Sequence, residues 1–173
     1  HTLAFECRPI QIACTIFKRM SITSYRYDHD FAPEGKTVLQ MGFPQYNDDF
    51  LYWTDLYRDA NKYKAKKERL AAALVERLNE RFPQYTGKFE IIDKWTPVTY
   101  NRICNCYNGS YSGYMMANHD NSMFLSGRIK NLNNVFLASQ WLMVPGGVPT
   151  AAAMGKFAVQ WILKTENKSI YIE

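Results

Sequence analysis

The chain has 173 residues, of which 47% are hydrophobic and 21% are charged. This length gives one domain or a large piece of one, and the composition excludes an intrinsically disordered chain. No apolar run approaches the length of a membrane span, so we expect any contact with a membrane at its surface. The net charge of +5 favours phosphate or anionic lipid, but much of it lies in residues 62–67, a run typical of a solvated helix face.

The four cysteines and three histidines are scattered, and no C-x-x-C pair occurs. This pattern predicts neither a metal site nor a disulfide framework, and it favours a reducing, cytoplasmic location. Cys104 and Cys106 are either a redox pair or two reduced cysteines in a strand or loop. The sequence starts at His1 rather than at a methionine, and we interpret it as a fragment of a longer chain.

Three segments rich in Ile, Thr, Tyr and Phe predict strands: 2–7, 11–17 and 21–27. We expect Pro9 to separate the first strand from the second. A turn containing Pro33 and Gly35 leads to a further strand at 36–43, which we expect to pair antiparallel with 21–27. Its few polar positions predict a place in the interior of the sheet.

The middle of the chain predicts helices. A short helix is expected after a cap at Asn47, Asp48 or Asp49, and a long one at 59–82. In the long helix Leu70, Leu74, Leu78 and Phe82 form the packing face, whereas Glu68, Arg69, Glu76, Arg77, Glu80 and Arg81 occupy the other. Residues 88–95 predict a strand, and Thr96 and Pro97 predict the start of a helix that ends near Ile103.

The segment 106–116 combines tyrosines with closely spaced glycines. It either lets a flat ligand lie against the backbone or forms a tight loop whose tyrosines pack on the core. A polar loop at 117–130 follows, and we expect 169–172 to add an edge strand.

A strand, a glycine turn and a helix make up residues 131–163. The apolar run 135–138 predicts a buried strand, and Pro145-Gly146-Gly147-Val148-Pro149 predicts a turn. Pro149 suits the first position of a helix, whose apolar spacing lasts to about Lys164. The unpaired N–H groups of such a helix favour an anion, although the same unit also occurs in α/β domains that bind nothing there.

Three blocks of this sequence resemble, in the same order, the phytoene desaturase family, closest to its carotenoid isomerase and retinol saturase-like branch. They are Tyr27-Asp28 with 31–39, Thr96-Pro97-Val98-Thr99-Tyr100, and Ala138-Ser139-Gln140-Trp141 with 145–149 and Gly155-Lys156. The resemblance implies a two-domain FAD-dependent oxidoreductase whose N-terminal Rossmann half is absent here. No G-x-G-x-x-G motif occurs in the chain.

The resemblance also implies the site. Pro145, Gly146, Gly147, Val148 and Pro149 would lie near the pyrimidine edge of the flavin ring. Ala138, Ser139 and Gln140 would border the ribityl chain or the dinucleotide linkage. Ser139 and Thr150 stand where many members have glycine, which puts close backbone approach in question at both points.

The resemblance implies desaturation, saturation or isomerisation of an apolar, polyene- or lipid-like substrate; no catalytic residue emerges. Five aromatic residues either line a substrate pocket or belong to the core: Tyr25, Tyr27, Phe43, Trp95 and Tyr111. One alternative is a stand-alone binding or interaction module with a degenerate flavoprotein fold. Another is a basic nucleic-acid binder, although no nucleic-acid motif is present.

The order of these elements predicts an α+β fold with a mixed, mainly antiparallel sheet and a long helix. By the resemblance, residues 1–127 would belong to the substrate domain. Residues 128–173, with the strand–glycine turn–helix unit, would complete the FAD-binding domain.

Overall fold

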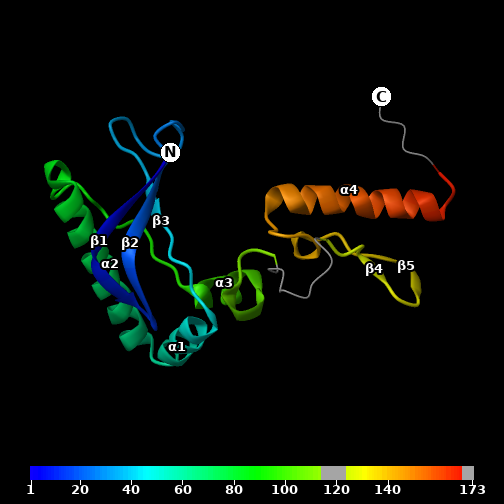
Figure 1. Cartoon of the computed structure of the whole chain (residues 1–173), viewed down its shortest axis with the longest axis horizontal. Coiled ribbons are helices and arrows are strands. Elements are labelled where there is room, and N and C mark those ends of the chain that lie inside the picture. The colour runs from blue at the N-terminus through cyan, green and yellow to red at the C-terminus, as the bar shows by residue number, and fades with distance from the viewer. Residues whose placement is uncertain (114–123, 169–173) are drawn as a thin grey trace. The chain divides into compact units, whose positions relative to one another are not determined.

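The computed structural model describes residues 1–113 and 124–168 as an α+β protein with small antiparallel sheets (Figure 1). The chain forms two compact units, 1–109 and 110–173. The predicted division after residue 127 refers to the domains of the family and stays a prediction. The predicted edge strand at 169–172 and half of the polar loop predicted at 117–130 lie outside the described residues.

The first unit contains one three-stranded sheet. Its strands are β1 (Thr2–Ile12), β2 (Thr15–Ser24) and β3 (Leu39–Met41), in the order β1-β2-β3 with antiparallel pairing throughout. The three strands predicted before residue 28 are therefore two, joined by a turn at Ala13, where φ is +52°. Pro9 does not end β1, because β1 is an edge strand and its pairing is irregular between Glu6 and Ile10, where a residue without an N–H is tolerated.

The predicted pairing of the fourth segment with the segment before it is confirmed, since β3 pairs with the end of β2. Its predicted interior position was wrong, because β3 is three residues long and lies at the edge of the sheet. Some of the apolar residues that suggested an interior strand lie outside β3 and pack in the core instead of pairing in the sheet. Phe43, for example, follows β3 and packs edge-on against Phe17 in the core.

Two helices follow the sheet, α1 (Asn47–Tyr57) and α2 (Ala60–Arg81), and both agree with the sequence prediction. Asp59 caps α2 by accepting hydrogen bonds from two backbone N–H groups, and Pro83 follows the end of the helix. The predicted cap of α1 was wrong. Tyr46 occupies the cap position, and Asp49 instead accepts from the backbone N–H of Tyr46 at 2.9 Å.

The core of this unit lies where α2 covers the β1–β2 hairpin (Figure 1). One cluster contains Ile10, Ile12, Trp53 and other residues between the sheet, α1 and α2, and a second joins Phe5, Met20, Ile22 and Leu78. Arg77 also lies in this interface and is 8% exposed, so its predicted place on the face away from the packing residues was wrong. The side chain is buried because it donates to the backbone carbonyls of Arg8 and Pro9.

The predicted strand at 88–95 was wrong, since these residues form no regular secondary structure. Ile91 and Ile92 lie exposed, and residues 88–95 pair with no strand in the described ranges 1–113 and 124–168. The helix predicted after them is confirmed as α3 (Pro97–Cys104). Thr96 caps it through a reciprocal pair of contacts with Thr99.

The second unit contains β4 (Arg128–Ile129), β5 (Leu132–Phe136) and α4 (Val148–Thr165). The strand predicted at 135–138 is present as β5 but is not buried, because β4 and β5 form a small sheet whose side chains are largely solvated. The buried hydrophobic residues described in this unit are Leu142, Met154 and Ala158. Within the described part of the chain, no helix is both long and apolar enough to span a membrane.

Candidate functional site

The glycine turn places two adjacent glycines before α4. Gly147 is the residue preceding the helix, with φ +93° and ψ 179°, a region that is almost exclusive to glycine. The helix begins at Val148, so Pro149 takes the second helical position rather than the predicted first. The positive φ of both glycines explains why the turn requires this residue type.

Hydrogen bonds at the turn leave part of the helix end unpaired. The backbone N–H of Gly147 donates to Oε1 of Gln140 at 2.8 Å, and Pro149 carries no N–H. The N–H groups of Val148 and Thr150 have no acceptor among the described residues. These two groups therefore carry the positive end of the α4 dipole toward the outside of the turn.

The two glycines differ in what surrounds them. A Cβ atom at Gly146 would lie 2.3 Å from the backbone nitrogen of Gly113, and the N–H of Gly113 donates to the carbonyl of Pro145 at 2.7 Å. Packing within the chain therefore requires glycine at 146. A Cβ atom at Gly147 would meet only Cδ of Pro149, at 3.9 Å, so open space lies beside this residue.

The two departures from the family pattern have structural roles. The Ser139 hydroxyl accepts from the backbone N–H of Trp141 at 3.2 Å, and it caps a short 3₁₀ turn. Thr150 is buried and donates its hydroxyl to the carbonyl of Gly146 at 2.9 Å. Both hydroxyl groups thus stabilise the turn itself.

The eight predicted site residues fall within one stretch of the second unit. Gln140 is hydrogen-bonded to the glycine turn. On both flanks of that turn, four of the eight side chains are exposed to solvent. The exposed members of the set are Ala138, Pro145, Val148 and Pro149. Val148 is the most open of them, with 84% of its surface accessible at the first position of the helix.

The described part of 106–116 contributes to the turn in a way that sequence reasoning missed. Gly113 supports Pro145 and Gly146, as given above, and Gly109 lies so close to Pro97 that a Cβ atom would overlap its carbonyl. The described tyrosines of this part, Tyr107 and Tyr111, are exposed, whereas one alternative required tyrosines packed on the core; Tyr114 lies outside the described residues. The repeated glycines were the available signal for these close approaches.

The five aromatic candidates have different surroundings. Tyr25 stacks on Phe31 with ring centroids 4.9 Å apart, while Tyr27 and Tyr111 are exposed and Phe43 belongs to the core. Trp95 alone of the five lines a described cavity. That cavity, of about 220 Å³, lies in the first unit between α2, α3 and residues 93–95.

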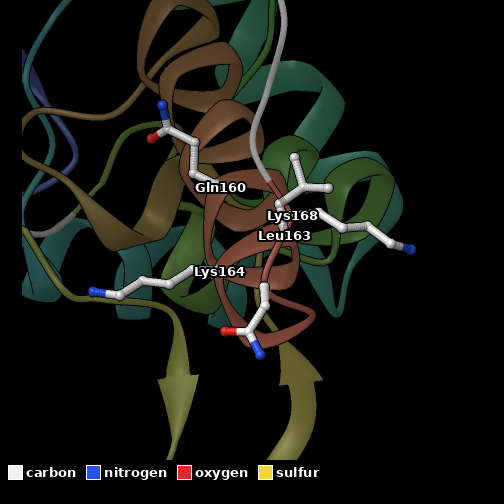
Figure 2. Close-up of a pocket in the computed structure, with 5 residues that line it drawn as sticks. Gln160, Leu163, Lys164 and Lys168 are labelled. Carbon is white, nitrogen blue, oxygen red and sulfur yellow. The ribbon is translucent and has the colours of Figure 1, made fainter.

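A second cavity lies at the C-terminal end of α4 and has a volume of about 370 Å³. Its lining comes from Gln160, Leu163, Lys164, Asn167 and Lys168, all from this helix end. Figure 2 shows that the side chains of Lys164 and Lys168 point in opposite directions rather than into a common space. This arrangement provides no convergent groups to hold a ligand.

The basic run at the start of α2 has intramolecular partners. Lys62 pairs with Asp59 at 3.2 Å, Lys66 lies over the Tyr52 ring, and Lys67 donates to the carbonyl of Lys94. Nothing in these contacts points to nucleic acid.

Among the described residues, the cysteines and the other possible metal ligands form no larger cluster. Cys104 and Cys106 are free thiols at the end of α3, and Sγ of Cys106 lies 3.6 Å from the carbonyl oxygen of Cys104. Desolvation raises the pKa of Cys106, and the neighbouring Cys104 adds to the effect. Within the described ranges no three His, Cys, Asp or Glu residues come together as a metal site.

Comparisons of this chain with protein-family models, with curated proteins and with solved structures found no match.

Proposed function

We propose that this chain is the C-terminal part of an FAD-dependent oxidoreductase of the desaturase, saturase or isomerase type. Its substrate would be apolar and polyene- or lipid-like. One observation carries the proposal: the open side of Gly147 lies directly before a helix with two N–H groups that have no acceptor in the described part of the chain. The three sequence blocks in family order support the same assignment.

The turn would take one edge of a flavin ring. Gly147 leaves room for a flat ring system to approach the backbone, and the exposed Val148 offers an apolar contact beside it. Gln140 holds the turn in shape through its bond to the Gly147 N–H. The bound flavin would supply the redox chemistry, while this chain would position its pyrimidine edge at the α4 dipole.

The helix end would tune the flavin. Reduction places negative charge on the N1 and C2 carbonyl region, and the N–H groups of Val148 and Thr150 would favour that charge by about 0.3–2 kcal/mol. For a two-electron couple this corresponds to about 5–40 mV. The helix therefore adjusts the potential of the flavin without determining it.

The second unit has the surface expected of a piece of a larger domain. Its small core leaves several large apolar side chains exposed: Phe124, Leu125, Leu132, Leu137, Val148 and Val159. Exposed apolar area of this kind marks surfaces that are covered by other polypeptide or by a ligand. In the proposed parent, the FAD-binding half would cover part of it. We further propose a cytoplasmic location, with any membrane contact at the surface.

The test is to express the protein encoded by the whole reading frame around this sequence. We expect the intact parent to purify yellow with bound FAD, and the 173-residue chain alone not to retain FAD. Gly147→Ala in the parent should weaken FAD binding. Gly87→Ala is the matched control, since Gly87 also has a positive φ and open space at its Cβ position. A colourless parent that cannot be reconstituted with FAD would contradict the proposal.

The rival hypothesis is a binding or interaction module without redox activity. A reading frame that begins near His1, together with a colourless protein, would favour it. A nucleic-acid binder would instead show binding to duplex or single strands that weakens steeply with salt.

A further inference from the structure

The cavity beside Trp95 in the first unit has features that the flavin proposal does not use. It has a volume of about 220 Å³, equal to about seven water molecules, which suits a molecule of about ten non-hydrogen atoms. Its lining comes from two stretches of the chain, 57–67 and 93–103. The residues are Tyr57, Tyr63 and Lys67 with Asp93, Lys94, Trp95, Val98, Thr99, Arg102 and Ile103.

Half of the residues that line this cavity are aromatic or apolar, and the other half are charged or polar. The Tyr57 and Tyr63 rings meet edge to face at 5.1 Å, and the Tyr63 hydroxyl is fixed by a 2.7 Å hydrogen bond with Oγ1 of Thr96. Trp95 and Ile103, which both line the cavity, are 48% and 66% exposed. A small apolar group placed there would remove their surface from water, which favours binding.

The charged groups of the cavity are mostly paired within the protein. Lys67 donates to the carbonyl of Lys94 at 3.0 Å, and the ammonium of Lys94 pairs with Glu68 at 2.9 Å. Asp93 accepts from the backbone N–H of Lys94 at 2.7 Å. Arg102 differs, since its guanidinium has no hydrogen-bond or ion-pair partner among the described residues. A guanidinium in this state is suited to hold a carboxylate through two parallel hydrogen bonds.

We propose that this cavity binds a small aromatic carboxylate, with the ring against Trp95 and Ile103 and the carboxylate on Arg102. Lys67 also favours an anionic ligand, because it places a second positive charge at the cavity. Its ammonium lies 5.0 Å from the centre of the Tyr63 ring. This inference uses only the first unit and does not depend on FAD.

The experiment titrates the 173-residue chain with phenylacetate and follows the tryptophan indole N–H signals by NMR. We expect a saturable shift of the Trp95 signal, assigned by its loss in Trp95→Phe. Phenylacetamide has the same shape without the charge and should bind at least about tenfold more weakly, as should acetate, which lacks the ring. A longer acid, decanoate, distinguishes a small-molecule site from one that takes the end of a lipid chain.

Two variants test the role of charge. Arg102→Gln should weaken phenylacetate binding at least about tenfold, and Ile103→Glu should do the same by placing a negative charge at the exposed wall. Arg58→Gln is the control, because Arg58 is an exposed arginine paired with Asp55 and does not line the cavity. All three positions are exposed, so circular dichroism should show unchanged folding.

Equal affinity for phenylacetate and phenylacetamide would overturn the proposal. The proposal would also be overturned if Arg102→Gln bound phenylacetate as tightly as the wild type does. The same holds if phenylacetate shifted other signals but not that of Trp95. Tighter binding of decanoate than of phenylacetate would also overturn it, in favour of a lipid-chain site. Because none of these outcomes involves flavin, the two proposals can fail independently.

Discussion

Replacing Arg77 with methionine tests how the long helix holds the edge strand. The guanidinium donates to the carbonyls of Arg8 at 2.9 Å, of Pro9 at 2.8 Å and of Ala73 at 2.7 Å. The first two carbonyls lie where the β1–β2 ladder is interrupted between Glu6 and Ile10, so β2 does not bond them in register. Arg77 thus satisfies acceptors that the sheet leaves open.

The size of the effect follows from these contacts. Ala73 lies four residues before Arg77 in α2, so its carbonyl still accepts the helical hydrogen bond from the Arg77 backbone N–H after the substitution. The carbonyls that lose their donor are therefore those of Arg8 and Pro9. An unsatisfied acceptor costs about 1–3 kcal/mol, and Arg8 and Pro9 lie in exposed positions that water reaches in part. We therefore expect Arg77→Met to lower the free energy of unfolding by about 2–4 kcal/mol.

The assay is urea unfolding followed by circular dichroism and by tryptophan fluorescence. Arg69→Met is the matched control, because Arg69 is an exposed arginine on the same helix, and it should change stability by less than about 0.5 kcal/mol. Arg77→Lys keeps the charge but not the fork of donors, so it should fall between the two. If Arg77→Met were as stable as Arg69→Met, the proposed role of these hydrogen bonds would be refuted.

Three further predictions concern single side chains. Asp49→Asn should lower stability by about 2–4 kcal/mol in the same assay, because the buried carboxylate accepts from Cys14, Thr15 and Tyr46; an unchanged midpoint would contradict this. Gly146→Ala should abolish the hydrogen-exchange protection of the backbone N–H that donates to Pro145, since the new Cβ atom would displace it; retained protection would refute the packing argument. Hydrogen bonds from Lys62 lower the pKa of Asp59. The cap is therefore fully effective above the usual Asp pKa of about 4 and is lost as pH falls through the lower folded value. As pH falls through that range, hydrogen exchange of the Lys62 backbone N–H should become faster in the wild type but not in Asp59→Asn.

Local signals in the sequence account for the helices. The repeat of leucines and the flanking Asp59 and Pro83 predict α2, because cap and stop act on the adjacent backbone alone. Thr96 and Pro97 predict α3 for the same reason. These elements depend on residues within one or two turns, and that is the range over which a single sequence is informative.

Tertiary contacts explain the sequence predictions that were wrong. Pro9 continues a strand because β1 lies at the edge of the sheet, and Arg77 is buried because that strand offers it carbonyls 68 and 69 residues away. Residues 88–95 have the composition of a strand but no partner strand in the described structure. Neither an edge nor a missing partner is visible in the local pattern.

The candidate site divides in the same way. The Gly146-Gly147 pair predicts the turn, and its positive φ values confirm the backbone reason for it. Which glycine is packed and which is open depends on Gly113, 33 residues before Gly146, and so could not be read from the turn itself. The bond between Gln140 and Gly147 likewise depends on the 3₁₀ turn that carries Gln140.

The most direct test of the central claim is the midpoint potential of FAD in the intact parent, compared between Val148→Asp and Val159→Asp. Both valines are exposed on α4, but only Val148 lies at the helix end proposed to face the flavin, and Val159 is about 16 Å further along the axis. We predict that Val148→Asp makes the potential more negative by about 10–40 mV and that Val159→Asp leaves it unchanged. Equal potentials in both variants and the wild type would contradict the claim that this helix end faces the flavin.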